Sequence, residues 1–229
     1  MRALQAIVFD FDGVIADSER LHLKAYQEVL AEDGRALGAD EYFGRYLGYD
    51  DQGVFRALAR DRGWDASAES IVRLIDRKSE RYEQLAAAGD MLFPGASAFI
   101  RRAAGEVPIG IASGALSHEI EDLLDRTDLR GCFAVIVGAD HTERSKPAPD
   151  PYLEAFARLQ IASSRALDRR CTIAIEDSRW GLEAARAAGL RCVAVTNTYS
   201  AAELQPYAEL IVSGLSALDL EALDELCER

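Results

Sequence analysis

Residues 6–14 read Ala-Ile-Val-Phe-Asp-Phe-Asp-Gly-Val and place two carboxylates directly after an uninterrupted apolar run. A run of Ala, Ile, Val and Phe without polar alternation is typical of a strand that is covered on both faces, as in a parallel sheet. The glycine allows the chain to bend tightly where a Cβ would clash. An isolated Asp-x-Asp-Gly is as often a solvated turn as a site, so the rest of the chain decides between them.

Short apolar runs of the same kind recur in the second half of the chain, each bounded by Gly, Asp or Ser and followed by a stretch with helical periodicity. They are residues 107–112, 134–137, 172–175, 192–195 and 210–212. Strands that alternate with helices predict an α/β fold with a Rossmann-like, doubly wound parallel sheet.

The segment between the first two predicted strands has a different pattern. Its apolar residues repeat at helical spacing without a strand-like run, and all six prolines of the chain lie at Pro94 or later. We expect an inserted α-helical cap domain over residues 17–89. Residues 1–16 and 90–229 are then expected to form the core that contains the sheet.

The charge and composition of the chain argue against several classes of protein. The 39 Asp and Glu against 26 Lys and Arg give a formal net charge of -13, which opposes binding to nucleic acid or to an anionic membrane. No apolar run approaches the roughly 18 residues of a membrane span, and the first residues lack a signal-peptide core. Separate cysteines without a CxxC pair favour reduced thiols over disulfides or zinc. We expect a soluble, cytoplasmic protein, with a monomer favoured over an oligomer.

Polar residues follow several of the predicted strands. Because ligands of open α/β sheets bind beyond the carboxyl ends of the strands, these residues are candidates for a site. They are Asp10, Asp12, Ser113, Gly114, Asp140, Glu176 and Asp177. Clustered carboxylates repel one another unless a raised pKa or a bound cation relieves the repulsion, and a small cluster of oxygen ligands suits Mg2+. We therefore expect a magnesium site at this edge of the sheet.

Four motifs occur in a fixed order: Asp10-Phe-Asp12-Gly13-Val14; Ile111-Ala-Ser113-Gly114; Lys146-Pro147-Ala-Pro149-Asp150; and Ile175-Glu176-Asp177-Ser178. In these motifs the chain resembles the haloacid dehalogenase superfamily, in the branch that inserts a helical cap after the first motif. That branch includes β-phosphoglucomutase and many sugar-phosphate phosphatases. The resemblance covers nearly the whole chain, because Asp-Ser-Glu at residues 17–19 leads into the cap and residues 181–189 continue the fourth motif.

The resemblance implies a role for each acidic residue. Asp10 is expected to be the nucleophile that becomes an aspartyl phosphate, since a carboxylate is already ionised at neutral pH and needs no base to activate it. Asp12 is expected to protonate the leaving oxygen and then to take a proton from water. The metal would be held by side chains of Asp10 and Asp177, by the backbone carbonyl of Asp12, and by Glu176 through a bound water.

The second and third motifs are expected to bind the phosphoryl group. By the resemblance, Ser113 and the backbone amide of Gly114 contact the transferring phosphoryl oxygens. Lys146 would neutralise charge on both the nucleophile and the phosphoryl group, and electrostatic stabilisation is the main work in phosphoryl transfer.

The cap is expected to select the substrate. His22 and Lys78 fall where β-phosphoglucomutase has a substrate-contacting histidine and lysine, with a packing role for His22 near the hinge as an equal alternative. Residues 44–51 resemble the substrate-specificity loop of the cap. Asp51 stands where the mutase carries an arginine for the distal phosphate, and a carboxylate would repel a second phosphate.

The sequence thus predicts a Mg2+-dependent phosphatase that acts on a small phosphorylated metabolite, with a sugar phosphate favoured, through an aspartyl phosphate. One alternative is a phosphomutase of the β-phosphoglucomutase type, which passes the phosphoryl group to a substrate hydroxyl. The other is a non-catalytic sensor of a phosphate ligand. Asp10 and Asp12 count against a sensor, because binding alone needs neither a nucleophile nor an acid.

Overall fold

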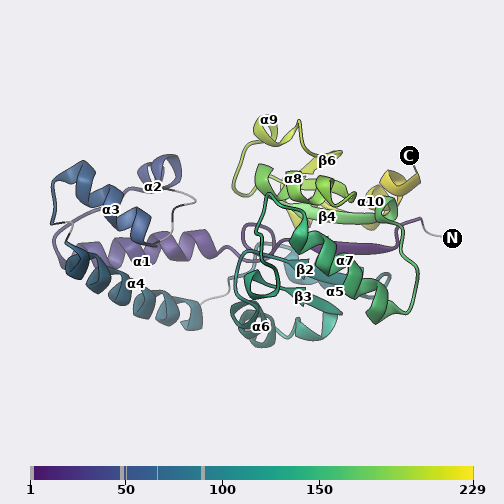
Figure 1. Ribbon diagram of the computed structural model, residues 1–229, viewed down its shortest axis with the longest axis horizontal. Helices are drawn as coiled ribbons and strands as arrows, with labels where there is room; N and C mark the ends of the chain where they lie inside the picture. The colour runs from purple at the N-terminus through teal and green to yellow at the C-terminus, as the bar shows by residue number, and fades with distance from the viewer. Residues whose placement is uncertain (1–2, 47–48, 50, 66, 89–90, 229) are drawn as a thin grey trace. The chain divides into compact units, whose positions relative to one another are not determined.

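The chain forms two compact units in a computed structural model that describes residues 3–46, 49, 51–65, 67–88 and 91–228 (Figure 1). One unit consists of Met1–Asp17 and Leu92–Arg229, and the other of Ser18–Met91. The sequence placed these boundaries after residues 16 and 89. Residues 89 and 90, where the second boundary was expected, lie outside the described residues.

The first unit is built on a parallel sheet, which within the described residues has six strands in the order β3-β2-β1-β4-β5-β6. The strands are β1 (Ala6–Phe9), β2 (Ile109–Ala112), β3 (Val135–Val137), β4 (Thr172–Glu176), β5 (Arg191–Val195) and β6 (Leu210–Val212). Because β1 pairs with both β2 and β4, the strand order runs outward from β1 in two directions: β2 and β3 lie on one side, and β4, β5 and β6 lie on the other. The carboxyl end of β1 is therefore the topological switch point, where ligands of such sheets bind.

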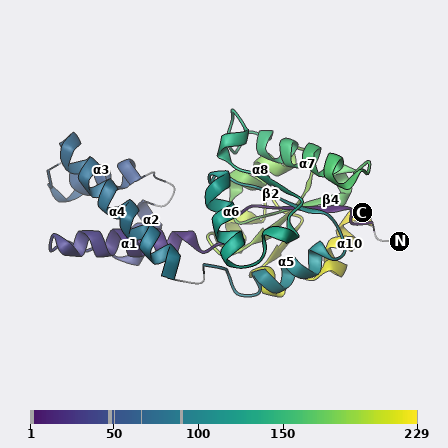
Figure 2. The ribbon, with the colours of Figure 1, turned by 90° about the horizontal axis from the view of Figure 1, so that it is seen from below.

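Helices cover both faces of this sheet. They are α5 (Ala96–Ala104), α6 (Ser117–Arg126), α7 (Asp150–Ser163), α8 (Arg179–Ala187), α9 (Ala201–Leu204) and α10 (Leu220–Glu228), with the 3-10 turns η1 (Arg130–Cys132), η2 (Ala139–His141), η3 (Arg169–Cys171) and η4 (Leu215–Ala217). Figure 2 shows α7 and α8 on one face of the sheet and α5 and α10 on the other. The predicted doubly wound α/β fold is thereby confirmed.

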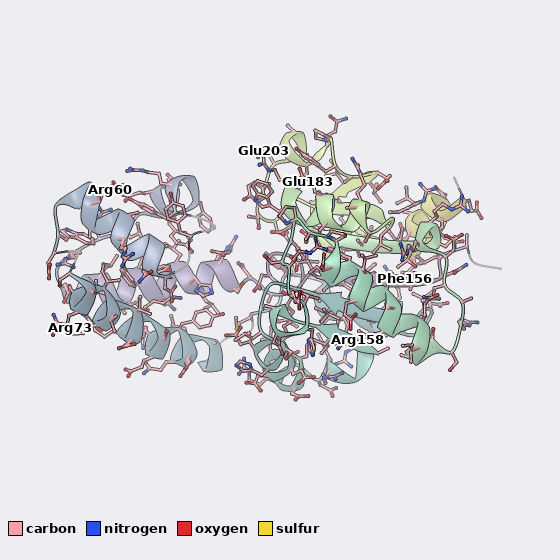
Figure 3. The ribbon with its side chains drawn as sticks, viewed as in Figure 1. Arg60, Arg73, Phe156, Arg158, Glu183 and Glu203 are labelled. Carbon is pink, nitrogen blue, oxygen red and sulfur yellow. The ribbon has the colours of Figure 1, made fainter. Side chains whose placement is uncertain are left out.

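The strands form because their apolar residues are covered on both faces. Every residue of β1, β2 and β4 is buried, and α7 packs Tyr152, Phe156 and Leu159 against the sheet. Figure 3 labels two residues of α7: Phe156, which belongs to the core, and Arg158, whose partly exposed side chain pairs with Glu154 of the same helix at 2.7 Å. The second strand begins at Ile109 and not at residue 107 as predicted, because the N–H of residue 107 donates to the carbonyl of Ala103 at the end of α5.

Within the described residues, the regular elements of the second unit are all helices. It contains α1 (Ser18–Glu32), α2 (Ala39–Arg45), α3 (Asp51–Arg62) and α4 (Ala68–Ala88), around a core that includes Tyr26, Phe55 and Leu58. Arg60 and Arg73 lie on the outside of α3 and α4 (Figure 3). Residues 47, 48 and 50 of the predicted specificity loop lie outside the described residues. No described helix combines the length and the apolar character that crossing a membrane requires.

Candidate active site

Asp10 lies at the carboxyl end of β1, in the position that the first motif predicts. Its backbone N–H donates to the carbonyl of Ile175 at 2.9 Å, which extends the pairing of β1 with β4 by one residue. The chain then turns back at once, because the carbonyl of Phe11 accepts hydrogen bonds from Ile15 and Ala16 and Gly13 adopts a φ of 78°. The Asp10 side chain is 11% exposed, so its carboxylate is nearly buried at this edge of the sheet.

Lys146 connects the first and fourth motifs. Its ammonium donates to Asp10 Oδ1 at 2.7 Å and to Glu176 Oε1 at 2.6 Å. Burial alone would lower the pKa of Lys146, but the charges of Asp10 and Glu176 and the hydrogen bonds to them outweigh burial and hold that pKa above its ordinary value. The lysine is therefore a fixed positive charge beside the candidate nucleophile.

Glu176 is fully buried, and both of its carboxylate oxygens accept hydrogen bonds. Oε1 accepts from Lys146 and from the hydroxyl of Tyr152 at 3.1 Å, and Oε2 accepts from the backbone N–H of Asp177 at 3.1 Å. The backbone N–H and hydroxyl of Ser178 also donate to Oε2, at 3.1 and 3.0 Å. Glu176 thus fixes both Lys146 and the junction between β4 and α8.

Gly181→Ala is expected to disturb this arrangement directly. A Cβ at Gly181 would lie 1.6 Å from Glu176 Oε1, so the carboxylate would have to leave its present position. We expect a loss of about 1–3 kcal/mol in the free energy of unfolding, as for other overpacked buried sites. Urea denaturation measures this loss. Gly131→Ala is the control, because a Cβ there meets nothing within 4 Å, and equal losses in both variants would contradict the steric argument.

Three carboxylates converge at the switch point. Oxygens of Asp10, Glu176 and Asp177 all lie within 4.8 Å of one another, and all three residues are buried. Burial, reinforced by Glu176 and opposed by Lys146, raises the pKa of Asp10 to about 7. Burial, reinforced by Glu176 and Asp10, also raises the pKa of Asp177 well above its ordinary value. One lysine does not balance this charge, so the cluster has the hard oxygen donors and the excess negative charge that suit a divalent cation.

The other two predicted acids differ in their placement. Asp12 is half-buried, and its charge contributes to the raised pKa of Asp10, as expected for a residue of the same site. Asp140, which was a candidate because it follows a strand, does not join the cluster. It is exposed and accepts hydrogen bonds from the N–H and hydroxyl of Ser117 at 2.8 and 2.5 Å, because the chain after β3 turns into η2 toward the start of α6.

The predicted phosphoryl-binding residues share one cavity of about 290 Å³. It is lined by Ser113, Gly114, Ala139, Thr142, Glu143, Ser145, Lys146 and Pro151. Ser113 is buried after β2, where its hydroxyl accepts a hydrogen bond from the N–H of Ala115 at 3.0 Å, while Gly114 is exposed. The structure therefore brings Ser113, Gly114 and Lys146 together, as the second and third motifs predict.

His22 and Lys78 meet inside the helical unit. The Lys78 ammonium lies 2.6 Å from His22 Nδ1 and 2.7 Å from Asp51 Oδ1, and the Lys78 side chain is 3% exposed. Tyr26 donates its hydroxyl to Asp51 Oδ1 at 2.5 Å, and the His22 ring stacks on Tyr82 at 4.2 Å. Burial, and then the charge of Lys78, lower the pKa of His22 to about 4. The helical unit thus holds a buried lysine whose charge Asp51 balances.

Two contacts of this site involve residues that the motifs do not include. Tyr152 on α7 donates to Glu176, and the hydroxyl of Thr198 after β5 lies close to Asp177 and opposes the rise in its pKa. Thr198 could have been found from the sequence, because it follows an apolar run just as the acidic residues do. Tyr152 gave no such signal, since its position on a buried helix face is equally typical of core packing.

The chain is similar to known proteins over most of its length. A family profile described as haloacid dehalogenase-like hydrolase matches residues 7–195. Protein CbbY of Rhodobacter capsulatus is 32% identical over 237 residues, which cover 97% of this chain and 99% of that protein. Fructose-1-phosphate phosphatase YqaB of Escherichia coli (strain K12) is 31% identical over 198 residues, covering 82% and 95%. The crystal structure of CbbY from Rhodobacter sphaeroides in complex with xylulose-(1,5)bisphosphate matches with a TM-score of 0.76 and 28% identity, covering 96% and 99%.

Proposed function

The chain belongs to the haloacid dehalogenase-like hydrolases, as a phosphatase of that family, and from this membership we propose a Mg2+-dependent enzyme that hydrolyses a small sugar phosphate. The observation that carries the proposal is the Lys146 ammonium shared by Asp10 and Glu176. This fixed positive charge pairs with the buried carboxylate of Asp10, and Lys146 lines the same cavity as Ser113 and Gly114, which supports a role for these residues in phosphoryl transfer. Phosphoryl transfer depends chiefly on such positioning and electrostatic stabilisation.

In the proposed reaction, Asp10 attacks the phosphorus and the bond between phosphorus and the sugar oxygen breaks. Asp12 donates a proton to the departing oxygen, which leaves as the sugar hydroxyl. Asp12 then takes a proton from water, whose oxygen attacks the aspartyl phosphate, and inorganic phosphate leaves as the Asp10 carboxylate is restored. Throughout, Lys146, Ser113 and the Gly114 amide bind phosphoryl oxygens.

We propose that the acidic cluster is the metal site. Asp10 and Asp177 would supply side-chain oxygens, and Asp12 its backbone carbonyl. The oxygens of Glu176 already accept hydrogen bonds from Lys146 and backbone groups, so Glu176 would act through a metal-bound water. When bound, Mg2+ supplies positive charge to the phosphoryl oxygens and the carboxylates.

The raised pKa of Asp10 predicts that Mg2+ stabilises the folded protein to an extent that depends on pH. In the metal-free protein the pKa of Asp10 is raised from 3.8 to about 7, so the folded state binds more protons than the unfolded state between those values, and its stability falls as pH rises through this window. Above pH 7 Asp10 is ionised in the folded protein, so it binds a cation without displacing a proton. We expect MgCl2 to raise Tm more at pH 8 than at pH 6, relative to EDTA.

Asp177→Asn is the control for this effect. It removes one candidate ligand with little change in shape, so the Mg2+-dependent rise in Tm should shrink at both pH values. A rise in Tm that is the same at pH 6 and pH 8, or that persists in full in Asp177→Asn, would contradict the assignment of the metal to this cluster.

The charge pair of Lys78 and Asp51 in the cap favours a substrate that carries one phosphate. Asp51 balances the charge of Lys78, so this pair offers no net positive charge to a second phosphate. Among the relatives, YqaB is named for a monophosphate substrate, whereas the CbbY structure contains a bisphosphate. A small ketose or aldose monophosphate is therefore the proposed substrate class.

A screen of phosphorylated metabolites with MgCl2, followed by 31P NMR of the products, tests the proposal. The screen should include fructose 1-phosphate and a pentulose bisphosphate. We expect inorganic phosphate as the product, with kcat/KM at least tenfold higher for the best monophosphate than for the bisphosphate. Isomerised sugar phosphate without inorganic phosphate would establish a mutase, and binding without turnover would establish a sensor.

A further inference from the structure

A loop outside the four motifs lies against the acidic cluster. It spans residues 196–200, between β5 and α9. At its start, the N–H of Thr196 donates to the carbonyl of Val212 on β6 at 3.0 Å. At its end, the N–H and hydroxyl of Ser200 donate to Glu203 Oε2 at 3.0 and 2.6 Å, in the capping box that begins α9. Because both ends are held by hydrogen bonds, the residues between them have a fixed position.

Two side chains from the middle of this loop contact the turn after β1 and the acid after β4. The Thr198 hydroxyl lies close to the carboxylate of Asp177, where it opposes the rise in the pKa of that carboxyl. Asn197 Nδ2 donates to the carbonyl of Gly13 at 2.8 Å. A Cβ built on Gly13 would lie 1.9 Å from Asp177 Oδ2 and 3.0 Å from Thr198 Oγ1, which shows how closely these three residues pack. The Asp177 carboxylate is therefore confined between the Gly13 backbone and the Thr198 hydroxyl.

We propose that Thr198 is a positioning residue of the metal site, which holds the Asp177 carboxylate in the orientation that binds Mg2+. This inference rests on the proposed function, since it takes Asp177 as a metal ligand. A carboxylate that is packed against a fixed hydroxyl cannot rotate freely, and its other lone pairs then keep a constant direction toward Asp10. Hydrogen-bond partners of ligating carboxylates typically contribute 10- to 100-fold to metal affinity. Asn197 supports this arrangement by fixing the Gly13 carbonyl beside the same carboxylate.

Calorimetric titration of metal-free protein with MgCl2, in the absence of substrate, tests the proposal. Thr198→Val keeps the branched shape and removes the hydroxyl, so we expect its Kd for Mg2+ to rise by roughly 10- to 100-fold. Thr198→Ser keeps the hydroxyl and should stay within about threefold of the wild type, since the polar contact with the carboxylate is retained. Thr196→Val is the matched control, because its side chain makes no hydrogen bond to the described residues. In steady-state assays, Thr198→Val should need more Mg2+ for half-maximal activity yet approach the wild-type kcat at saturating Mg2+.

An unchanged Mg2+ affinity in Thr198→Val would overturn the inference, as would equally weak binding by Thr198→Ser, which would assign the effect to packing. If Thr198→Val does not fold, Thr198→Ala serves in its place. It also removes the hydroxyl but adds no methyl group at that position. A wild-type protein that does not bind Mg2+ would instead refute the metal of the proposed function. Failure of the inference and failure of the proposed function are therefore distinguishable.

Discussion

Asp10→Asn is expected to lower kcat by at least about 10⁴-fold while the protein stays folded, because removal of a covalent nucleophile has effects of this size. An amide of the same shape cannot attack phosphorus as a carboxylate does. The backbone position of residue 10 is fixed by its hydrogen bond to the Ile175 carbonyl, so the substitution leaves the turn after β1 in place. The loss should therefore appear in the chemical step and not in the fold.

Trapping of the phosphoenzyme separates this role from metal binding. Acid-quenched wild-type protein incubated with labelled substrate should contain an acyl phosphate at Asp10, and Asp10→Asn should contain none. The exposed Asp122 on α6 provides the matched control, since Asp122→Asn makes the same chemical change far along the chain and should leave both kcat and Tm unchanged. Residual turnover within 100-fold of the wild type would reject Asp10 as the nucleophile.

The fold could be predicted from apolar runs, because each buried strand of a parallel sheet needs apolar residues on both faces. The run at residues 6–9 coincides with β1, three other strands differ from the prediction by one residue at one end, and the largest error is at the start of β2. That error has a local cause. The N–H of residue 107 donates to the carbonyl of Ala103 at the end of α5. A sequence pattern does not show whether such a residue donates its backbone hydrogen bond to the preceding helix or to a strand of the sheet.

The candidate site was only partly predictable, because the strand-end rule gives an edge of the sheet but not the direction of each side chain. It identified Asp10, Glu176 and Asp177, which converge, and it also included Asp140, which caps a helix instead. The contact of Asp51 with Lys78 joins α3 to α4 across 27 residues of sequence. Contacts of this kind depend on helix packing, which neither spacing nor composition encodes.

Lys146→Met is expected to lower kcat/KM by about 10³-fold, since removal of one charge-stabilising donor from an active site has effects of this order. The lysine is the cation that Asp10 and Glu176 share, at 2.7 and 2.6 Å, and Met replaces its stem without its charge. Steady-state kinetics at saturating MgCl2 measure the loss. Lys24→Met, on an exposed position of α1, is the control and should retain full activity.

The same substitution should also destabilise the fold, and the dependence on pH identifies the cause. Removing one partner from a buried ion pair leaves uncompensated charge, at a cost of about 3–5 kcal/mol. Without Lys146, the buried carboxylates of Asp10 and Glu176 repel more strongly, so protonation of Asp10 offsets part of the loss at low pH. Urea denaturation in EDTA should therefore show a larger loss at pH 8 than at pH 6. Lys146→Arg should have the same low kcat/KM as Lys146→Met, because its planar guanidinium cannot donate to both carboxylates from the position of a single ammonium nitrogen. Equal destabilisation at the two pH values would mean that packing of the lysine stem, and not its charge, holds Asp10 and Glu176 in place.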